Sequence, residues 1–304
     1  MSVVVIGSLN IDHVYTVDQF VRPGQTITTS SYEIYAGGKG FNQSIALARA
    51  GSGVVHIGKI GPDGEWLKAR LYDEHVDTSH LETDMIPTGH AMIQVVTSGE
   101  NAIFLYPGAN HTLDIDRVED ALAAHTPSSP DLETGHCGFL LLQNETNIVA
   151  DLIRLGHKYN RFIVLNPAPM TNDVIDYPLE LVGLFILNRN EAVRLFGQTE
   201  PDAVRAAVRA KYPSARVIYT LGAEGAHYFD SEVSYFQPCY KVEAVDSTGA
   251  GDTFIGYFIA AISAGSSVET ALNTAAKAAA LCVTRHGASD SIPFVDEVRS
   301  AHFE

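Results

Sequence analysis

The sequence is poor in cysteine, and its cysteines are not arranged as pairs. Cys137, Cys239 and Cys282 are scattered along the chain and form no Cys-x-x-Cys motif. This spacing excludes a disulfide framework and a zinc knuckle, and it is typical of a reducing compartment. The twelve histidines contain no His-x-x-x-His pair, so a zinc site on a helix is not expected.

Positive charge is scarce as well. The chain has 20 Lys and Arg residues against 36 Asp and Glu residues, which gives a formal net charge of −16. This balance argues against binding to nucleic acid or to an anionic membrane. No apolar run is long enough to span a bilayer, and residues 1–7 lack the basic start and long apolar core of a signal peptide. We therefore expect a cytoplasmic protein.

Short apolar runs bounded by glycine or polar residues dominate the rest of the chain. Residues 3–6 are wholly apolar and end at Gly7, as expected of a strand buried on both faces of a parallel sheet. After residue 138, strand, polar loop and helix alternate repeatedly. This rhythm predicts an α/β fold in which a mainly parallel sheet is sandwiched by helices, with residues 1–304 forming one domain.

Two parts of the chain differ from the rest in composition and in hydrophobic pattern. Residues 15–17 with 27–35, and 91–96 with 102–106, are rich in β-branched and aromatic residues and partly alternate with polar ones. They predict antiparallel ribbons inserted at approximately 12–36 and 90–106, which together would form a small β lid. An extension of the edge of the main sheet is the alternative.

A glycine-rich turn near the C-terminal end is the main candidate for chemistry. It covers 246–254, follows a strand-like run at 240–245 and leads into an apolar helix at 253–262. The free N–H groups at a helix N-terminus favour an anion, and Gly249 and Gly251 allow it to approach closely. Asp252 would place a carboxylate beside that anion. The same residues would also serve as a plain helix cap.

Two familiar phosphate-binding motifs are excluded at this turn. A dinucleotide fingerprint that starts at Gly249 needs glycine where Phe254 stands. A P-loop needs Gly-Lys followed by Ser or Thr, and neither Gly-Lys pair of the chain has that neighbour.

A second glycine-rich turn, at 36–44, precedes an amphipathic helix that ends at Gly51. Three glycines surround Lys39, and Asn42 follows, which favours close approach by a polar ligand over simple turn chemistry. Polar side chains at predicted strand ends and helix starts complete one rim of the sheet. They are Asn10, Asp12, Lys39, Asn42, Glu145, Asn188, Glu191 and Asp252. Each alone also reads as a turn, cap or surface group.

These segments together resemble the ribokinase-like family of sugar kinases over essentially the whole chain. Residues 37–43 and 246–254 look like the two signatures of that family. The supporting segments, in family order, are 7–12, 166–169, Asn188-x-x-Glu191, 220–225 and 283–288.

The resemblance implies ATP-dependent phosphorylation of a primary hydroxyl, typically the 5-hydroxyl of a pentose such as ribose. It makes Asp252 the catalytic base and the N–H groups of Gly249, Ala250 and Gly251 an anion hole, as phosphoryl transfer requires. The residues implied to bind the sugar are Asn10, Asp12, Gly38, Lys39, Gly40, Asn42, Glu145 and Asp252. Those implied to bind ATP are Asn188, Thr220, Gly222, Gly225 and Gly251.

The same resemblance implies Mg²⁺ and a monovalent cation, usually K⁺. Glu191 would act on Mg²⁺ indirectly, since magnesium keeps several waters and few protein ligands. The K⁺ positions are Asp246, Thr248, Cys282, Arg285, Gly287 and Ser291, mostly through backbone carbonyls. The resemblance also implies a homodimer through the lid, whose edges would otherwise invite strand pairing.

Four residues depart from the family pattern. Phe41 and Arg189 are bulky inside the motifs, His13 adjoins Asp12, and His90 replaces a small apolar residue. Phe41, His13 and His90 could reshape the sugar pocket, which leaves a nucleoside kinase as an alternative; Phe41 could equally pack under the lid. A catalytically silent sugar or nucleotide sensor of the same fold is the other alternative, against which the intact Asp252 turn argues.

Overall fold

A nine-stranded sheet forms the centre of the protein. The computed structural model of the chain describes residues 2–96, 98, 100–130 and 135–303. The strand order is β13-β12-β11-β10-β9-β8-β1-β4-β5, parallel from β11 to β5, with β12 and β13 added antiparallel. The strands are β1 (Val3–Ile6), β4 (Val54–Ile60), β5 (Leu81–Thr83), β8 (Phe139–Gln143), β9 (Phe162–Asn166), β10 (Leu184–Asn188), β11 (Arg216–Thr220), β12 (Ala226–Phe229) and β13 (Ser234–Gln237).

The central strands are apolar throughout because both faces of the sheet are covered. In β1, Val3 and Val5 belong to one hydrophobic core, whereas Val4 and Ile6 belong to another. Successive side chains of a strand point to opposite faces, so the two cores lie on opposite sides of the sheet. Burying each of these side chains stabilises the fold by about 1.5–3 kcal/mol.

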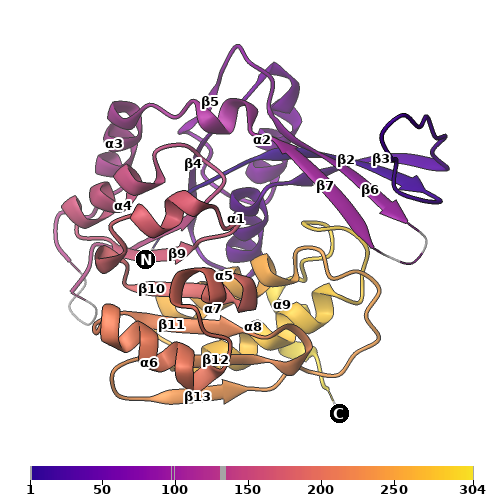
Figure 1. The fold of residues 1–304 in the computed structure, drawn as a ribbon. Helices are drawn as coiled ribbons and strands as arrows, with labels where there is room; N and C mark the ends of the chain where they lie inside the picture. The colour runs from indigo at the N-terminus through magenta and orange to yellow at the C-terminus, as the bar shows by residue number, and fades with distance from the viewer. Residues whose placement is uncertain (1, 97, 99, 131–134, 304) are drawn as a thin grey trace.

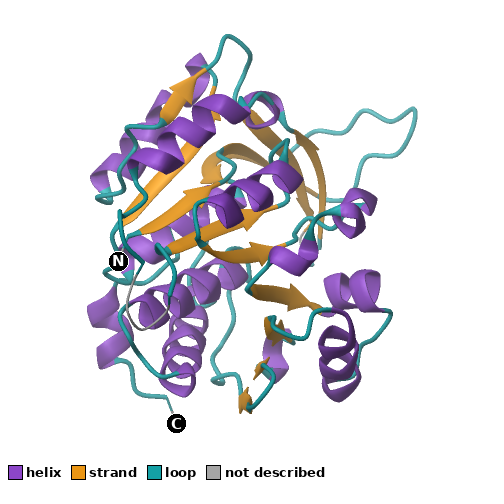
Figure 2. Ribbon diagram, turned by 90° about the vertical axis from the view of Figure 1, so that its left-hand side faces the viewer, coloured by secondary structure: helices purple, strands orange, loops and turns teal. Residues whose placement is uncertain are grey.

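Helices form a layer on each side (Figures 1 and 2). The helices whose apolar residues belong to the Val3 core are α1 (Lys39–Arg49), α2 (Glu65–Asp73), α7 (Ala250–Ser263), α8 (Val268–Cys282) and α9 (Val295–Ser300). Those of the Val4 core are α3 (Ile115–Ala124), α4 (Val149–Lys158), α5 (Arg189–Phe196) and α6 (Pro201–Lys211). The α/β prediction of a mainly parallel sheet between helices is confirmed. Within the described ranges, no helix is long and apolar enough to cross a membrane.

A second, four-stranded sheet projects from the main body (Figure 1). Its order is β3-β2-β6-β7, and it combines two antiparallel ribbons, as predicted, through a parallel contact between β2 and β6. We call it the small sheet. Its strands are β2 (Asn10–Val17), β3 (Ser31–Gly37), β6 (Gly89–Val96) and β7 (Asn101–Tyr106).

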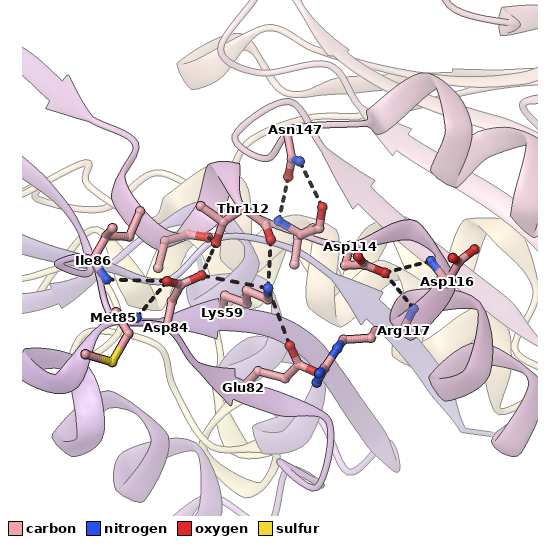
Figure 3. Close-up of polar contacts among 12 residues, drawn as sticks. Lys59, Glu82, Asp84, Met85, Ile86, Thr112, Asp114, Asp116, Arg117 and Asn147 are labelled. Carbon is pink, nitrogen blue, oxygen red and sulfur yellow. Dashed lines mark hydrogen bonds and ion pairs between the residues drawn. The ribbon is translucent and has the colours of Figure 1, made fainter.

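A polar cluster ties the small sheet to the main body (Figure 3). The Lys59 ammonium on β4 donates to the Thr112 carbonyl at 2.7 Å and pairs with Glu82 at 3.5 Å and Asp84 at 3.8 Å. The Thr112 hydroxyl donates to Asp84 at 2.7 Å. Asp84 precedes β6 and Thr112 follows β7, so one partly buried cation contacts both connections of this ribbon.

One predicted strand is absent and one hairpin was not predicted. Residues 240–245 are not a strand, although they are rich in strand-forming residues; most are exposed and lie against no neighbouring strand. The edge of the sheet is formed instead by the β12–β13 hairpin, which the sequence did not predict. Helix α7 also begins earlier than expected, at Ala250, so Asp252 lies in its first turn.

Candidate active site

The predicted polar residues gather at the carboxyl edge of the main sheet. Strands β1, β8, β9 and β10 are parallel neighbours and end at this edge, with Gln143 level with Asn166. The N-termini of α1 and α7 meet there, because Asn42 of α1 donates to Asp252 of α7 at 3.0 Å. This edge is where α/β folds bind their ligands.

Asp252 is almost fully buried, and both of its carboxylate oxygens accept hydrogen bonds. Asn42 Nδ2 donates to Oδ2, and Gln43 Nε2 donates to Oδ1 at 2.8 Å. The turn before it ends at Gly249, which caps α7 in the left-handed region with φ 77°. The Gly251 position has open space around it, with no atom within 4 Å of where a Cβ would lie. Gly251 therefore leaves room for an anion beside Asp252 at the N-terminus of α7, where the Ala250 N–H already donates to the Ser247 carbonyl at 3.3 Å.

The α1 turn lies directly against the loop that follows β1. A Cβ at Gly38 would lie 2.9 Å from the Asn10 backbone nitrogen, and one at Gly40 would lie 2.5 Å from that of Ser8. Only glycine permits this approach. Lys39 N and Ser8 Oγ both donate to Glu145 Oε2, at 2.9 and 2.5 Å.

The small sheet adds its polar residues to the same place. Asp12 on β2 lies over Gly37, where a Cβ would collide with its carboxylate. Asn10 Oδ1 accepts a hydrogen bond at 2.8 Å from Asn110, whose side chain also bonds both backbone groups of Leu9. The predicted sugar-binding residues therefore converge.

The site is acidic and has one buried cation at its centre. Burial opposes the charge of Lys39, but Asp252, Glu145, Glu191 and Asp12 outweigh it and raise the pKa of Lys39. Burial, with repulsion from Glu145, raises the pKa of Asp12 to about 7, against a smaller opposing effect of Lys39. Burial also raises the pKa of Glu191.

Asn188 and Glu191 bind each other at the start of α5. Glu191 accepts from the Asn188 backbone and side chain, both at 2.7 Å, and the Asn188 side chain caps the helix. A cavity of about 490 Å³ adjoins the pair and is lined by Met170, Asn188, Asn190, Glu191, Val193 and Arg194. Of the other predicted nucleotide residues, Thr220 ends β11 and bonds the Leu187 carbonyl. Gly222 and Gly225 bound the next turn with φ 60° and 118°.

The predicted cation residues come from two segments that meet, the turn before α7 and the end of α8 with the residues that follow it. Asp246 accepts from Thr248 and, at 3.0 Å, from Gly287 N. Burial raises the pKa of Asp246, but these hydrogen bonds outweigh it and hold the pKa below its usual value. Cys282 Sγ lies 3.0 Å from Ser291 Oγ, which donates to the Ala288 carbonyl.

Two groups do not join the site through their side chains. The Arg285 guanidinium pairs with Glu297 at 2.6 Å, and Arg189 pairs with Glu224 at 2.7 Å on the surface. In the described part of the chain, no group of three or more His, Cys, Asp or Glu side chains is arranged to hold a metal ion.

The residues that depart from the family pattern lie outside the pocket. Phe41 is fully buried in the hydrophobic core, so its packing role is the one that the structure supports. His13 follows Asp12 in β2 and points to the other face of the small sheet, where it contacts Tyr32 and His90.

Sequence reasoning missed several amides that complete the site. Gln43, Gln143, Asn166 and Asn110 are all buried. Gln43 ends the first glycine-rich segment, and Gln143 and Asn166 close strands, so their positions were the signal that could have found them. Their contacts, however, join residues about a hundred or more positions apart in most cases.

The fold and site define an enzyme class in which a helix N-terminus and a carboxylate act together on an anion and a polar ligand. The model of the pfkB family carbohydrate kinases matches residues 1–294. The chain belongs to this family, and it is an ATP-dependent carbohydrate kinase.

Individual relatives agree with the family match. The chain is 37% identical over 296 residues to the ribokinase of Haemophilus influenzae, which covers 95% of this chain and 94% of the relative. It is 33% identical over 313 residues to that of Staphylococcus aureus, covering 97% and 98%. The structure of Arabidopsis thaliana ribokinase complexed with ribose and ATP superposes with a TM-score of 0.82 at 28% identity, covering 98% of this chain and 97% of the other.

Proposed function

We propose that the protein transfers the γ-phosphoryl group of ATP to the 5-hydroxyl of a pentose such as ribose. The observation that carries the proposal is the buried Asp252 carboxylate in the first turn of α7, beside the open space at Gly251. The names of the relatives support the choice of a pentose.

In this reaction Asp252 is the general base. The hydroxyl oxygen forms a bond to the γ-phosphorus, its proton passes to the Asp252 carboxylate, and the bond to the bridging oxygen of ADP breaks. The N–H groups of Gly249, Ala250 and Gly251 face the charge on the transferring group, because the N-terminus of α7 favours an anion.

The sugar lies between the two sheets. Carboxylates and amides suit a polyol because each accepts or donates at defined hydroxyl groups. The residues assigned to it are Asn10, Asp12, Gly38, Lys39, Gly40, Asn42 and Glu145. ATP takes the adjacent side, at Asn188, Thr220, Gly222, Gly225 and Gly251.

Mg²⁺ enters with ATP and neutralises phosphate charge. Both oxygens of Glu191 already accept hydrogen bonds from Asn188, which fits contact with hydrated Mg²⁺ through water. A monovalent cation, K⁺ in our proposal, is assigned to Asp246, Thr248, Cys282, Arg285, Gly287 and Ser291, because the Asp246 carboxylate already joins the two segments that carry them by accepting from Thr248 and Gly287.

We also propose a cytoplasmic homodimer in which the small sheet is both lid and interface. Cys137, Cys239 and Cys282 are free thiols, in keeping with a reducing compartment. The outer face of the small sheet exposes aromatic and aliphatic side chains, which supports a second copy as its partner. The nucleoside alternative rested on Phe41, His13 and His90, and none of them lines the pocket side of Asp12.

The test is ADP release from ATP and Mg²⁺, with and without K⁺, over ribose, deoxyribose, hexoses and nucleosides. We expect turnover of a pentose that K⁺ increases; turnover of nucleosides alone contradicts the proposal. Asp252→Asn should lower kcat by about 10²–10⁴-fold and keep the fold, since Asn is nearly isosteric with Asp and its side-chain oxygen can still accept one of the two hydrogen bonds from Asn42 and Gln43. Asp120→Asn, on the exposed side of α3, is the matched control.

A further inference from the structure

A chain of buried side-chain amides lies behind the Asp252 carboxylate. Gln43 Nε2 donates to Asp252 Oδ1 at 2.8 Å and lies 3.4 Å from Asn166 Oδ1. Gln143 Nε2 donates to Gln43 Oε1 at 2.7 Å. Asn166 in turn donates to the Ile186 carbonyl at 3.1 Å. The chain therefore joins α7, α1 and the ends of β8 and β9.

The direction of these hydrogen bonds follows from the carboxylate. An ionised carboxylate only accepts, so the amide nitrogen of Gln43 must face Asp252. The Gln43 oxygen then faces Gln143, whose nitrogen must turn toward it. This leaves Gln143 Oε1 buried without a partner. Such an unpaired acceptor destabilises the folded state, so this arrangement of amides is not the one that stability alone would favour.

The two ends of the carboxylate are thus held from one helix. Asn42 and Gln43 are adjacent in α1 and bind Oδ2 and Oδ1 respectively. Gln43 has no exposed surface, so it acts on a ligand through Asp252 rather than by contact. Two donors in fixed positions determine the plane of the carboxylate, and hence where its remaining lone pairs point.

We propose that Gln43 is a positioning residue that orients the Asp252 carboxylate to accept the hydroxyl proton, and that Gln143 acts only by orienting Gln43. The proposal rests on the assignment of Asp252 as the base. It adds a requirement that this assignment alone does not contain: the side-chain amide of Gln43 must direct its nitrogen toward the Asp252 carboxylate.

The first test is Gln43→Leu, which removes the donor and keeps a similar volume. We expect kcat to fall by about 10–100-fold while the KM values for sugar and ATP change less than about threefold, since only the reacting geometry is lost. Asn273→Leu removes a half-buried amide that donates to Tyr240 at 2.7 Å, away from the site, and is the control for general damage. Unchanged kcat in Gln43→Leu overturns the proposal.

The second test uses charge and does not depend on packing. Gln43→Glu keeps the size and shape of the side chain but places a second carboxylate against that of Asp252. We expect a larger loss of kcat than for Gln43→Leu at alkaline pH, with recovery relative to wild type as the pH is lowered and the introduced carboxyl group becomes a donor. A pH-independent ratio of the two kcat values contradicts the proposed donor role.

The third test is a double-mutant cycle on kcat. Gln143→Leu should lower kcat by about 3–10-fold. In the double variant with Gln43→Leu it should lower kcat no further, because Gln143 acts through Gln43. Additive losses would mean that Gln143 acts by another route. The Asp252→Asn variant separates the two claims: if it abolishes turnover while Gln43→Leu leaves kcat unchanged, only the positioning role fails, and if it retains turnover, the base assignment itself fails.

Discussion

The Lys39 ammonium lies among the carboxylates of Asp252, Glu145, Glu191 and Asp12, whose combined attraction outweighs its burial and raises its pKa. These carboxylates come from four different elements or loops. Folding therefore concentrates negative charge around one cation. Among these carboxyl groups, Asp12 is the one whose titration should be measurable near neutrality, since burial and repulsion from Glu145 raise its pKa to about 7.

Asp12 should make sugar affinity depend on pH near neutrality. An ionised carboxylate can accept hydrogen bonds from two hydroxyl groups of a sugar, whereas the protonated form can accept fewer. We expect KM for the sugar to rise as the pH falls through about 7. Asp12→Asn should remove this dependence and raise KM at all pH values. Steady-state kinetics from pH 5.5 to 8.5 measure it, and a KM of wild type that stays constant over this range contradicts the prediction.

The ionised carboxyl group of Asp12 should lower the free energy of unfolding in alkaline solution. Its pKa in the folded protein lies above the usual 3.8, so its contribution to stability is complete below 3.8 and is lost as the pH rises through about 7. Asp12→Asn should therefore raise Tm at pH 8 by a few degrees relative to its effect at pH 5. Calorimetry at the two pH values decides, and an equal shift at both pH values argues against the raised pKa.

Helices α1 and α7 carry the two anion-facing turns and touch where a glycine permits it. A Cβ at Gly256 would lie 2.4 Å from that of Ala46 and 2.8 Å from the Leu47 nitrogen. The distance between these helices sets how Asn42 and Gln43 meet Asp252. Packing between elements thus controls the geometry of the carboxylate.

Gly256→Ala should separate these helices. Overpacking at this contact is expected to cost about 1–3 kcal/mol of unfolding free energy and to lower kcat more than KM. Gly53→Ala is the matched control, because a Cβ there would meet other atoms only at 3.9 Å. Thermal denaturation and kinetics of both variants test it; equal Tm values for the two would show that α1 and α7 shift freely.

The Lys59 cluster should hold the β6–β7 ribbon in place. Lys59→Met leaves Glu82, Asp84 and the Thr112 carbonyl without the ammonium, so the two connections of the ribbon lose their common partner. We expect faster amide exchange in β6 and β7 than in β8 and β9. Lys241→Met, on an exposed segment, is the control. A uniform change of exchange over all strands is the contrary outcome.

At the scale of the whole molecule, the small sheet presents an apolar surface. Tyr32, Ile34, Phe104 and Tyr106 share the face opposite Asp12, and Phe104 is 61% exposed. Strands β3 and β7 also have free edges. Exposed strand edges and apolar patches of this kind favour pairing with another chain.

We expect a dimer at micromolar concentration in sedimentation velocity experiments. Phe104→Glu places a charge on the proposed interface and should yield a monomer, whereas Ile175→Glu changes an exposed residue between β9 and β10, outside the small sheet, and should not. A wild-type protein that sediments as a monomer contradicts the dimer.

Several elements of the fold and of the site could be predicted from local sequence alone. The apolar run at Val3–Ile6, the two glycine-rich turns and Asp252 identify themselves because local composition dictates strand burial, turn conformation and helix capping. The family resemblance then assigned them an activity that the pfkB match supports. The strand expected at 240–245 failed because strand-forming composition needs a neighbouring strand, which is not a local property.

Tertiary structure alone decided which side chains meet. Gln43 and Asp252 are 209 positions apart, and Gln143 is 100 from Gln43, so their hydrogen bonds depend on how α1, α7 and β8 pack. Burial likewise turned Phe41 into a core residue and raised the pKa of Asp12. Local sequence determines which conformations a segment favours, whereas burial and long-range contacts, which set pKa values and carboxylate orientation, exist only once the layers have assembled.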